Sequence, residues 1–96
     1  MVKHMVMWRL GATINEADWT QMLQAIAVMS AGIVGLRTLE IGVNRSTVAD
    51  CSDIGLYSAF DSWEALRNYE VHPLHEVLKR IIGPIKTDKR VVDYEI

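Results

Sequence analysis

The segment YEVHPLHEVL, residues 69–78, concentrates the side chains best suited to chemistry, because Tyr69, His72 and His75 lie close together in it. A neutral imidazole can accept or give a proton near pH 7, and a tyrosine hydroxyl can donate to a developing oxyanion. The third histidine, His4, lies near the N-terminus. If the fold brings His4, Tyr69 and His75 together, the sequence predicts acid–base catalysis that needs no cofactor.

A metal site is the first alternative, because histidines three residues apart on a helix can point the same way. Pro73 weakens it, since a proline pushes the preceding residue out of the α-helical region and leaves the direction of His72 undefined. We identify no third ligand in the segment; His4, Asp93 or Glu95 would have to come from elsewhere in the fold. We therefore expect no bound metal.

Structural roles compete with catalytic ones for these residues. His72 precedes Pro73 and could cap the next helix by bonding to backbone groups. Tyr69 and His75 could form a half-buried pair whose hydrogen bonds are satisfied within the protein. On a helical wheel His75 lies about 100° from Leu74 and borders the apolar stripe, where a pocket could desolvate it. We therefore expect His75, with Tyr69 as its nearest polar neighbour, to carry any chemistry.

The elements that must position these residues follow from apolar periodicity. Four segments show the alternation or composition typical of strands, namely Val2–Leu10, Leu36–Asn44, Ile54–Phe60 and Arg90–Ile96. After the first strand, Thr13 and Glu16 predict a capping box that opens a long amphipathic helix. Gly32 and Gly35 are expected to end that helix.

The second helical region is expected to break at its proline. Asp61 with Glu64 predicts the start of a helix that ends near His72, and Pro73 suits the first turn of another helix that runs to Gly83. The predicted fold class is α+β, the ferredoxin-like β-α-β-β-α-β order with an antiparallel four-stranded sheet and the helices on one face. We treat residues 1–96 as one domain.

The strands predict a partner as well as a sheet, because they are apolar on both faces. In Val2–Leu10, Val6 and Trp8 alternate with Met5 and Met7. Half of the 96 residues are apolar, more than one small core needs. A bare apolar face would be an association site, so we expect a homodimer in which two sheets pack face to face as an α+β barrel.

Composition excludes several classes of partner. The net charge of −2 and a pI near 5.8 leave no basic surface for phosphates, so we expect neither nucleic acid nor a membrane as partner. No apolar run approaches the ~20 residues of a membrane span, and the N-terminus lacks a signal-peptide pattern. The single cysteine, Cys51, agrees with a reducing compartment, which we take to be the cytoplasm. Glycine-rich phosphate loops, dinucleotide fingerprints and G-x-S-x-G motifs are absent.

Several stretches together resemble the stress-responsive dimeric A/B barrel family, called Dabb, over nearly the whole chain. These are VKHMVMWRL, GLRTLEIGVN, AFDSWEALRNYEVHPLHEVL and VVDYEI. The most specific pieces are Lys3-His4, Gly42-x-Asn44, Tyr69-x-x-His72-Pro73-x-His75 and Asp93-Tyr94. The resemblance implies a ferredoxin-like monomer and a dimer whose two sheets form a barrel.

The resemblance also implies a range of functions. Many members of the family are known only as stress-induced proteins, whereas a plant polyketide cyclase shows that the scaffold can catalyse. The tyrosine and histidine that matter in that cyclase match Tyr69 and His75, and its N-terminal histidine matches His4. These matches imply a small apolar or polyketide-like ligand and cofactor-free acid–base chemistry. A further pocket histidine of the cyclase falls at or near Ile54 here, which argues against a shared substrate.

Two alternatives remain open at this stage. The chain could be a non-catalytic structural stress protein, in which the same histidines only fasten the kinked helical region. It could also be a cofactor-independent monooxygenase-like enzyme, because those enzymes resemble this dimeric barrel as well.

Overall fold

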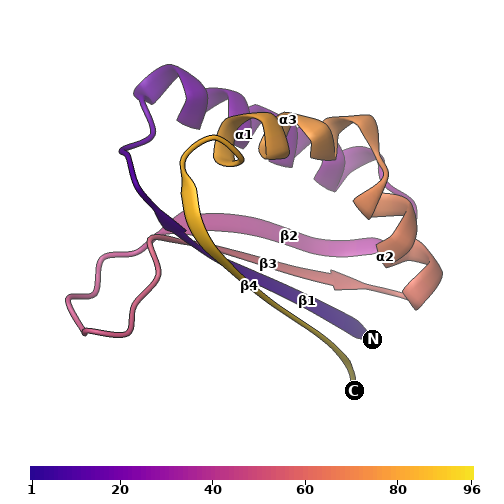
Figure 1. Ribbon diagram of the computed structural model, residues 1–96. Helices are drawn as coiled ribbons and strands as arrows, with labels where there is room; N and C mark the ends of the chain where they lie inside the picture. The colour runs from indigo at the N-terminus through magenta and orange to yellow at the C-terminus, as the bar shows by residue number, and fades with distance from the viewer.

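Four antiparallel strands form one sheet, and three helices cover a single face of it (Figure 1). The computed structural model describes all residues, 1–96. Its elements are β1 (Val2–Leu10), α1 (Glu16–Gly32), β2 (Leu36–Val43), β3 (Ile54–Phe60), α2 (Trp63–Glu70), α3 (Pro73–Ile82) and β4 (Lys86–Glu95). The strand order is β2-β3-β1-β4, which confirms the predicted ferredoxin-like fold. β4 begins four residues earlier than the sequence indicated.

The register of the central strand β1 decides which side chains share a face. His4 lies opposite Ser58 of β3 and opposite Asp93 of β4. Directly opposed residues on antiparallel strands point to the same face of the sheet. Asp93 therefore joins His4 on the face that the helices cover.

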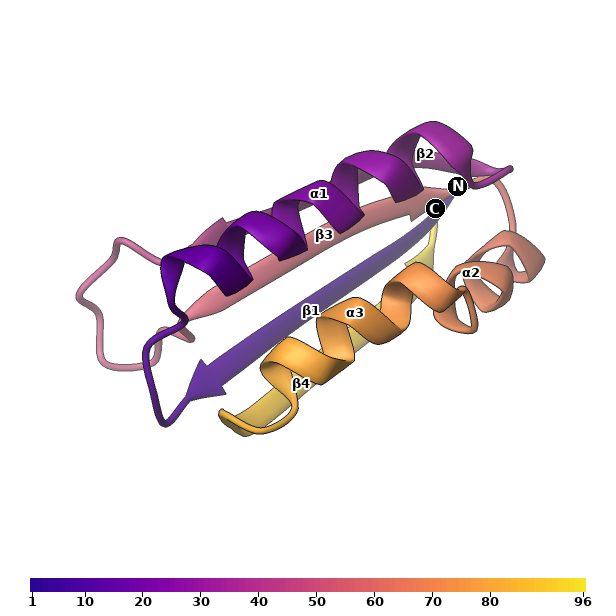
Figure 2. The same ribbon diagram turned by 90° about the horizontal axis from the view of Figure 1, so that it is seen from above.

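The core lies between this face of the sheet and the helices. Viewed from above, α1 and α3 lie side by side over the strands (Figure 2). The buried apolar residues come from every layer: Val2, Val6 and Trp8 of β1, Ile54, Leu56 and Phe60 of β3, Met22, Ile26 and Met29 of α1, and Leu66, Tyr69, Leu78, Ile81 and Ile82 of α2 and α3. No helix of the chain has the length and apolar character needed to span a membrane.

The residue that caps the first helix lies two positions after the predicted one. Asn15, not Thr13, caps α1, and its side-chain oxygen accepts a hydrogen bond from the Asp18 amide at 2.7 Å. Asparagine is at least as good a cap as threonine, so the position closer to the helix prevails over the capping-box pattern. The predicted capping box of Thr13 and Glu16 is therefore wrong.

The second helix also begins at a neighbouring cap. Ser62, not Asp61, caps α2 by accepting a hydrogen bond from the Ala65 amide at 3.1 Å. Asp61 instead accepts two hydrogen bonds from the guanidinium of Arg37, at 2.6 and 3.0 Å. This pairing ties the first residues of β2 to the end of β3 and lowers the pKa of the Asp61 carboxyl.

The break before Pro73 is confirmed. α2 ends at Glu70 and α3 begins at Pro73, whose missing amide hydrogen costs nothing in a first helical turn. His72 has extended backbone angles, and its Nδ1 accepts a hydrogen bond from the Leu74 amide at 3.1 Å. The structural role considered for His72, a helix cap, is therefore present.

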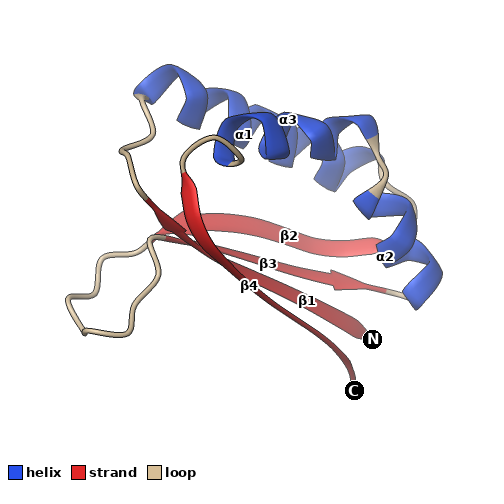
Figure 3. Ribbon diagram, viewed as in Figure 1, coloured by secondary structure: helices blue, strands red, loops and turns tan.

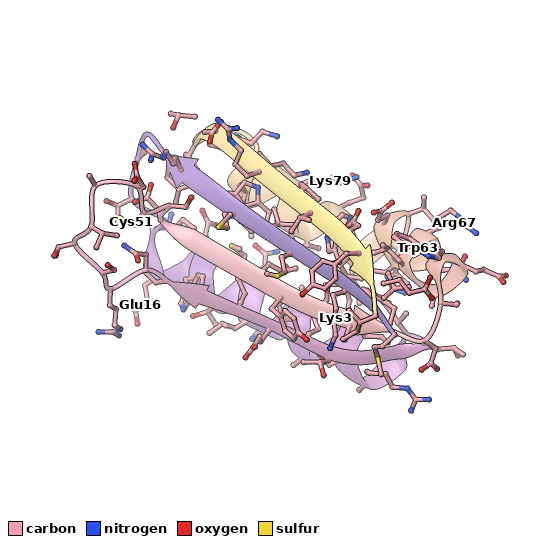
Figure 4. All side chains as sticks on the ribbon, turned by 90° about the horizontal axis from the view of Figure 1, so that it is seen from below. Lys3, Glu16, Cys51, Trp63, Arg67 and Lys79 are labelled. Carbon is pink, nitrogen blue, oxygen red and sulfur yellow. The ribbon has the colours of Figure 1, made fainter.

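The face of the sheet opposite the helices is uncovered and partly apolar. Figure 4 shows it from below, with Lys3 among the side chains that stand on it. The register places Met5 and Met7 of β1, Tyr57 of β3, and Val92 and Tyr94 of β4 on this face. Met7 and Val92 are each 47% exposed. The expectation of apolar side chains on both faces is confirmed for β1 and β4, whereas β2 places Glu40 on the uncovered face.

The two ends of the molecule differ in character (Figure 3). The loop of residues 44–53 projects at the end where β1 leads into α1. The chain termini and α2 lie at the other end, which we call the terminal end of the sheet. His4, Tyr69 and His75, the residues predicted to carry any chemistry, lie toward the terminal end.

The turn between α1 and β2 requires a glycine. Gly35 has a φ of +84°, a conformation that L side chains rarely adopt. A Cβ atom at this position would lie 2.7 Å from the Cβ of Ala65, so the turn is packed directly against α2.

We expect Gly35→Ala to lower the free energy of unfolding by about 2 kcal/mol or more, from the left-handed conformation and the contact with Ala65. Gly32→Ala is the matched control, because a Cβ there meets nothing within 4 Å; it should be neutral or slightly stabilising. Urea denaturation measures both. Equal stability of the two variants would contradict the packing of this turn.

Candidate functional site

His4, Tyr69 and His75 come together at the terminal end of the sheet, from β1, α2 and α3. The ring centroids of Tyr69 and His75 are 4.8 Å apart, and those of His4 and Tyr69 are 6.0 Å apart. We call these three residues the His–Tyr–His cluster. The structure brings together the residues that the sequence analysis selected, although most of the chain separates His4 from the other two.

Tyr69 is the centre of the cluster and is fully buried. Its ring also packs on Phe60, with centroids 5.2 Å apart. No protein atom makes a hydrogen bond with its hydroxyl group. Burial, reinforced by the charge of Glu70, raises the pKa of this hydroxyl well above its usual value, so it stays protonated and can donate a hydrogen bond.

His75 is half-buried beside Tyr69, and its hydrogen bond defines which nitrogen is free. Its Nδ1 lies 2.9 Å from the backbone carbonyl of Glu70. A carbonyl can only accept, so Nδ1 carries the proton and Nε2 has the lone pair in the neutral ring. Desolvation lowers the pKa of His75, with the Glu70 carbonyl opposing this effect. Near pH 7 His75 is therefore neutral and can accept a proton at Nε2.

His4 is oriented by a carboxylate. Its Nδ1 binds the side chain of Asp93, the residue directly opposite it on β4. An ionised carboxylate can only accept, so this contact assigns the proton to Nδ1 and leaves Nε2 of His4 as the free acceptor. The imidazole is nearly fully buried, whereas the Asp93 side chain keeps contact with solvent.

His72 does not join the cluster, because its Nδ1 caps α3. The Nδ1 atoms of His72 and His75 are thus both bonded to backbone groups, one accepting and the other donating. The two histidines of the segment therefore have different tasks, which the spacing alone does not reveal.

Glu70 is the residue of this region that sequence analysis missed. His4, Glu70 and Asp93 present potential metal-ligand atoms within 4.8 Å of one another. Asp93 and His4 are hydrogen-bonded to each other, the arrangement of a histidine oriented by a carboxylate and not of two ligands that face an ion. We therefore assign no metal to this group. The available signal for Glu70 was its position beside Tyr69, at the end of a predicted helix.

Two cavities of the chain lie away from the cluster. One, of about 450 Å³, adjoins Leu10 and Trp19 at the opposite end of the molecule. The other, of about 720 Å³, lies on the uncovered face of the sheet between Arg9 and Arg90. None of the three cluster residues lines either cavity. The Tyr69 ring packs against the rings of Phe60, His4 and His75.

Comparison with known proteins identifies the class. The chain matches the family model of the stress responsive A/B barrel domain, Dabb, over residues 2–96. It belongs to that family, which confirms the resemblance seen in its sequence. Among curated protein sequences, none matches the chain significantly.

Solved structures give the same fold. A dimeric protein with a ferredoxin-like fold from Bacteroides fragilis is 30% identical, with a TM-score of 0.80 over 99% of this chain and 95% of its own. A dimeric ferredoxin-like protein from Thermobifida fusca is 23% identical, with a TM-score of 0.82 over 99% and 90%. Hydroxynitrile lyase from Passiflora edulis is 19% identical, with a TM-score of 0.76 over 99% and 92%.

We expect Tyr69→Phe to raise the free energy of unfolding by about 1 kcal/mol or more, because it removes a buried hydroxyl that no protein group satisfies. Tyr57→Phe is the control, since the Tyr57 hydroxyl accepts a hydrogen bond from Lys3 at 2.8 Å and its loss should not stabilise. Denaturant unfolding compares the two. A destabilised Tyr69→Phe variant would show that the hydroxyl contributes to folding.

Proposed function

We propose that this Dabb protein binds a small carbonyl compound at the His–Tyr–His cluster and performs cofactor-free acid–base chemistry there. One observation carries the proposal: the Tyr69 hydroxyl is buried beside two imidazoles and has no hydrogen-bond partner within the protein. Buried polar groups in native proteins are nearly always paired, so an unpaired one requires an explanation. A ligand oxygen that accepts its hydrogen bond is the explanation we favour.

The roles follow from the free atoms of each residue. Nε2 of His75 is the base that takes a proton from the carbon next to the carbonyl group. The Tyr69 hydroxyl donates to the oxygen on which the negative charge develops, and burial strengthens that interaction. Nε2 of His4, oriented by Asp93, is a second acceptor for a hydroxyl group of the ligand. The imidazolium of His75 then returns the proton to the product.

The ligand class is small and mostly apolar, because the neighbours of the cluster are Phe60 and the apolar faces of α2 and α3. Polyketide-like compounds with reactive carbonyl groups fit this description. Binding requires α2 and α3 to separate from the sheet, since Tyr69 is completely covered. The non-helical backbone of residues 71–72, between the two helices, is a suitable hinge whatever side chain it carries. The fold of the hydroxynitrile lyase shows only that such a scaffold can carry an enzyme.

A structural stress protein is the second candidate, and the complete burial of Tyr69 among neighbouring rings favours it. In that case the Glu70–His75 and His4–Asp93 contacts only fasten α3 and β4 to the rest of the fold. The stress-response role and the cytoplasmic location are also part of the proposal, and they rest on family membership and on the unpaired Cys51.

We also infer that the protein forms a homodimer through the uncovered face of the sheet. Met5, Met7, Tyr57, Val92 and Tyr94 would otherwise face water. The similar proteins from Bacteroides fragilis and Thermobifida fusca are described as dimeric. Two sheets packed in this way would form the barrel.

The test of chemistry is hydrogen–deuterium exchange at the carbon beside the carbonyl of simple aryl methyl ketones, followed by NMR. We expect the wild type to accelerate exchange and His75→Ala to lose about 10²–10⁴-fold of the rate. His72→Ala is the matched control, because it removes a cap worth about 1 kcal/mol without touching the cluster. Circular dichroism verifies that both variants fold. Equal rates for His75→Ala and wild type would leave the structural candidate.

The test of assembly is light scattering at micromolar concentration. We expect the wild type to have twice the chain mass of 10.9 kDa, and Met5→Glu to be monomeric because it places a charge at the centre of the interface. Val34→Glu is the control, since Val34 is 91% exposed and lies between α1 and β2. A monomeric wild type would remove both the dimer and the barrel.

A further inference from the structure

One of the two cavities described above lies far from the proposed catalytic cluster. The cavity of about 450 Å³ is at the end of the molecule from which the 44–53 loop projects (Figure 1). His4 and Leu10 stand near the two ends of β1, and six residues of strand span about 20 Å. The cavity is therefore a separate site, and its ligand does not depend on the proposed function.

The walls of this cavity are mainly apolar. Leu10, Ile14, Trp19, Val43 and Ile54 supply them, from the end of β1, the approach to α1, α1 itself, and the facing ends of β2 and β3. Trp19 is half-buried, so one part of its indole ring is available to a ligand. The volume lies within the range of small-molecule sites, which are typically apolar with a few fixed polar groups.

Asp53 is the fixed polar group. Its Oδ2 accepts a hydrogen bond from the Leu10 amide at 2.7 Å, while its own amide donates to the Trp8 carbonyl and its carbonyl accepts from the Asn44 amide, both at 2.8 Å. These contacts hold the carboxylate in position. Its second oxygen, Oδ1, has no partner, and no lysine or arginine forms an ion pair with Asp53. Oδ1 of Asp53 is thus a charged hydrogen-bond acceptor with a fixed position at the cavity wall.

The remaining polar surroundings agree with a positive ligand. The Asn44 side chain is occupied at both ends by Ser46, donating at 2.8 Å and accepting at 3.1 Å. The start of α1 would favour an anion, but Asn15 occupies one of its free amides, and Glu16 and Asp18 add negative charge in its first turn. Asp53 is the one charged residue among those that line the cavity.

We propose that this cavity binds a small organic ammonium compound. The ammonium group binds Oδ1 of Asp53, and an aromatic or branched aliphatic body packs between Trp19 and Ile54. A charge-assisted hydrogen bond to a fixed carboxylate supplies orientation, and the indole face adds attraction for the cation. The apolar body gains by leaving water.

Isothermal titration calorimetry on the full chain, with 2-phenylethylamine hydrochloride and 2-phenylethanol, tests the proposal. The two compounds share one skeleton and differ in charge. We expect the amine to bind at least about tenfold more tightly than the alcohol, because only the amine pairs with the carboxylate. Equal affinities, or no binding of the amine up to about 10 mM, would overturn the proposal.

Asp53→Asn provides the matched variant. The amide oxygen of asparagine can still accept the Leu10 hydrogen bond, so the loop keeps its contact while the charge is lost. We expect amine affinity to fall about tenfold or more. Asp50→Asn is the control, because Asp50 is an exposed carboxylate of the same loop that does not line this cavity. An equal loss in both variants would mean non-specific attraction and would exclude the site. If Asp53→Asn fails to fold by circular dichroism, the comparison of amine and alcohol on the wild type decides alone.

Discussion

The missing amide hydrogen of Pro73 is the constraint on which the geometry of the cluster depends. A continuous helix from Trp63 to Ile82 would need that hydrogen bond and would clash with the proline ring. The chain instead ends α2 at Glu70, turns at His72 and starts α3 at Pro73. The turn frees the Glu70 carbonyl from helical bonding, and this carbonyl accepts the hydrogen bond from His75. One covalent feature thus places two side chains and fixes the tautomer of one of them.

Next to this break, the ring of Tyr69 stabilises the fold, whereas its unpaired hydroxyl lowers stability and is the group used in the proposed function. Its ring is one of the largest fully buried groups of the core and touches Phe60, His4 and His75. Its hydroxyl gains nothing from the protein in return. Phenylalanine would fill the same space without the desolvation cost. Under the function proposed above, the hydroxyl is kept for a ligand at some cost to the stability of the fold.

Periodicity and proline chemistry made the fold predictable, because both are local. The strands, the helix break and the buried face of β1 followed from residue spacing alone. Which of two adjacent residues caps a helix was less predictable. Ser62 caps α2 because Asp61 is paired with Arg37, which lies 24 residues away in the sequence. The convergence of His4, Tyr69 and His75 was predictable as a possibility, but the contribution of Glu70 was not. It acts through its backbone carbonyl, which any residue would provide, so no side-chain pattern signals it.

The alternation of β1 makes one strand serve two surfaces at once. His4 points to the core, while its neighbours Lys3 and Met5 stand on the uncovered face. Inserting or deleting one residue in β1 would exchange the side chains of its two faces, so the His–Tyr–His cluster and the uncovered face would be lost together. Evolution of this strand must therefore proceed by substitution at constant length. Between the hydrogen-bonded residues Asn44 and Asp53, the loop carries no such coupling, and variation in length can accumulate there.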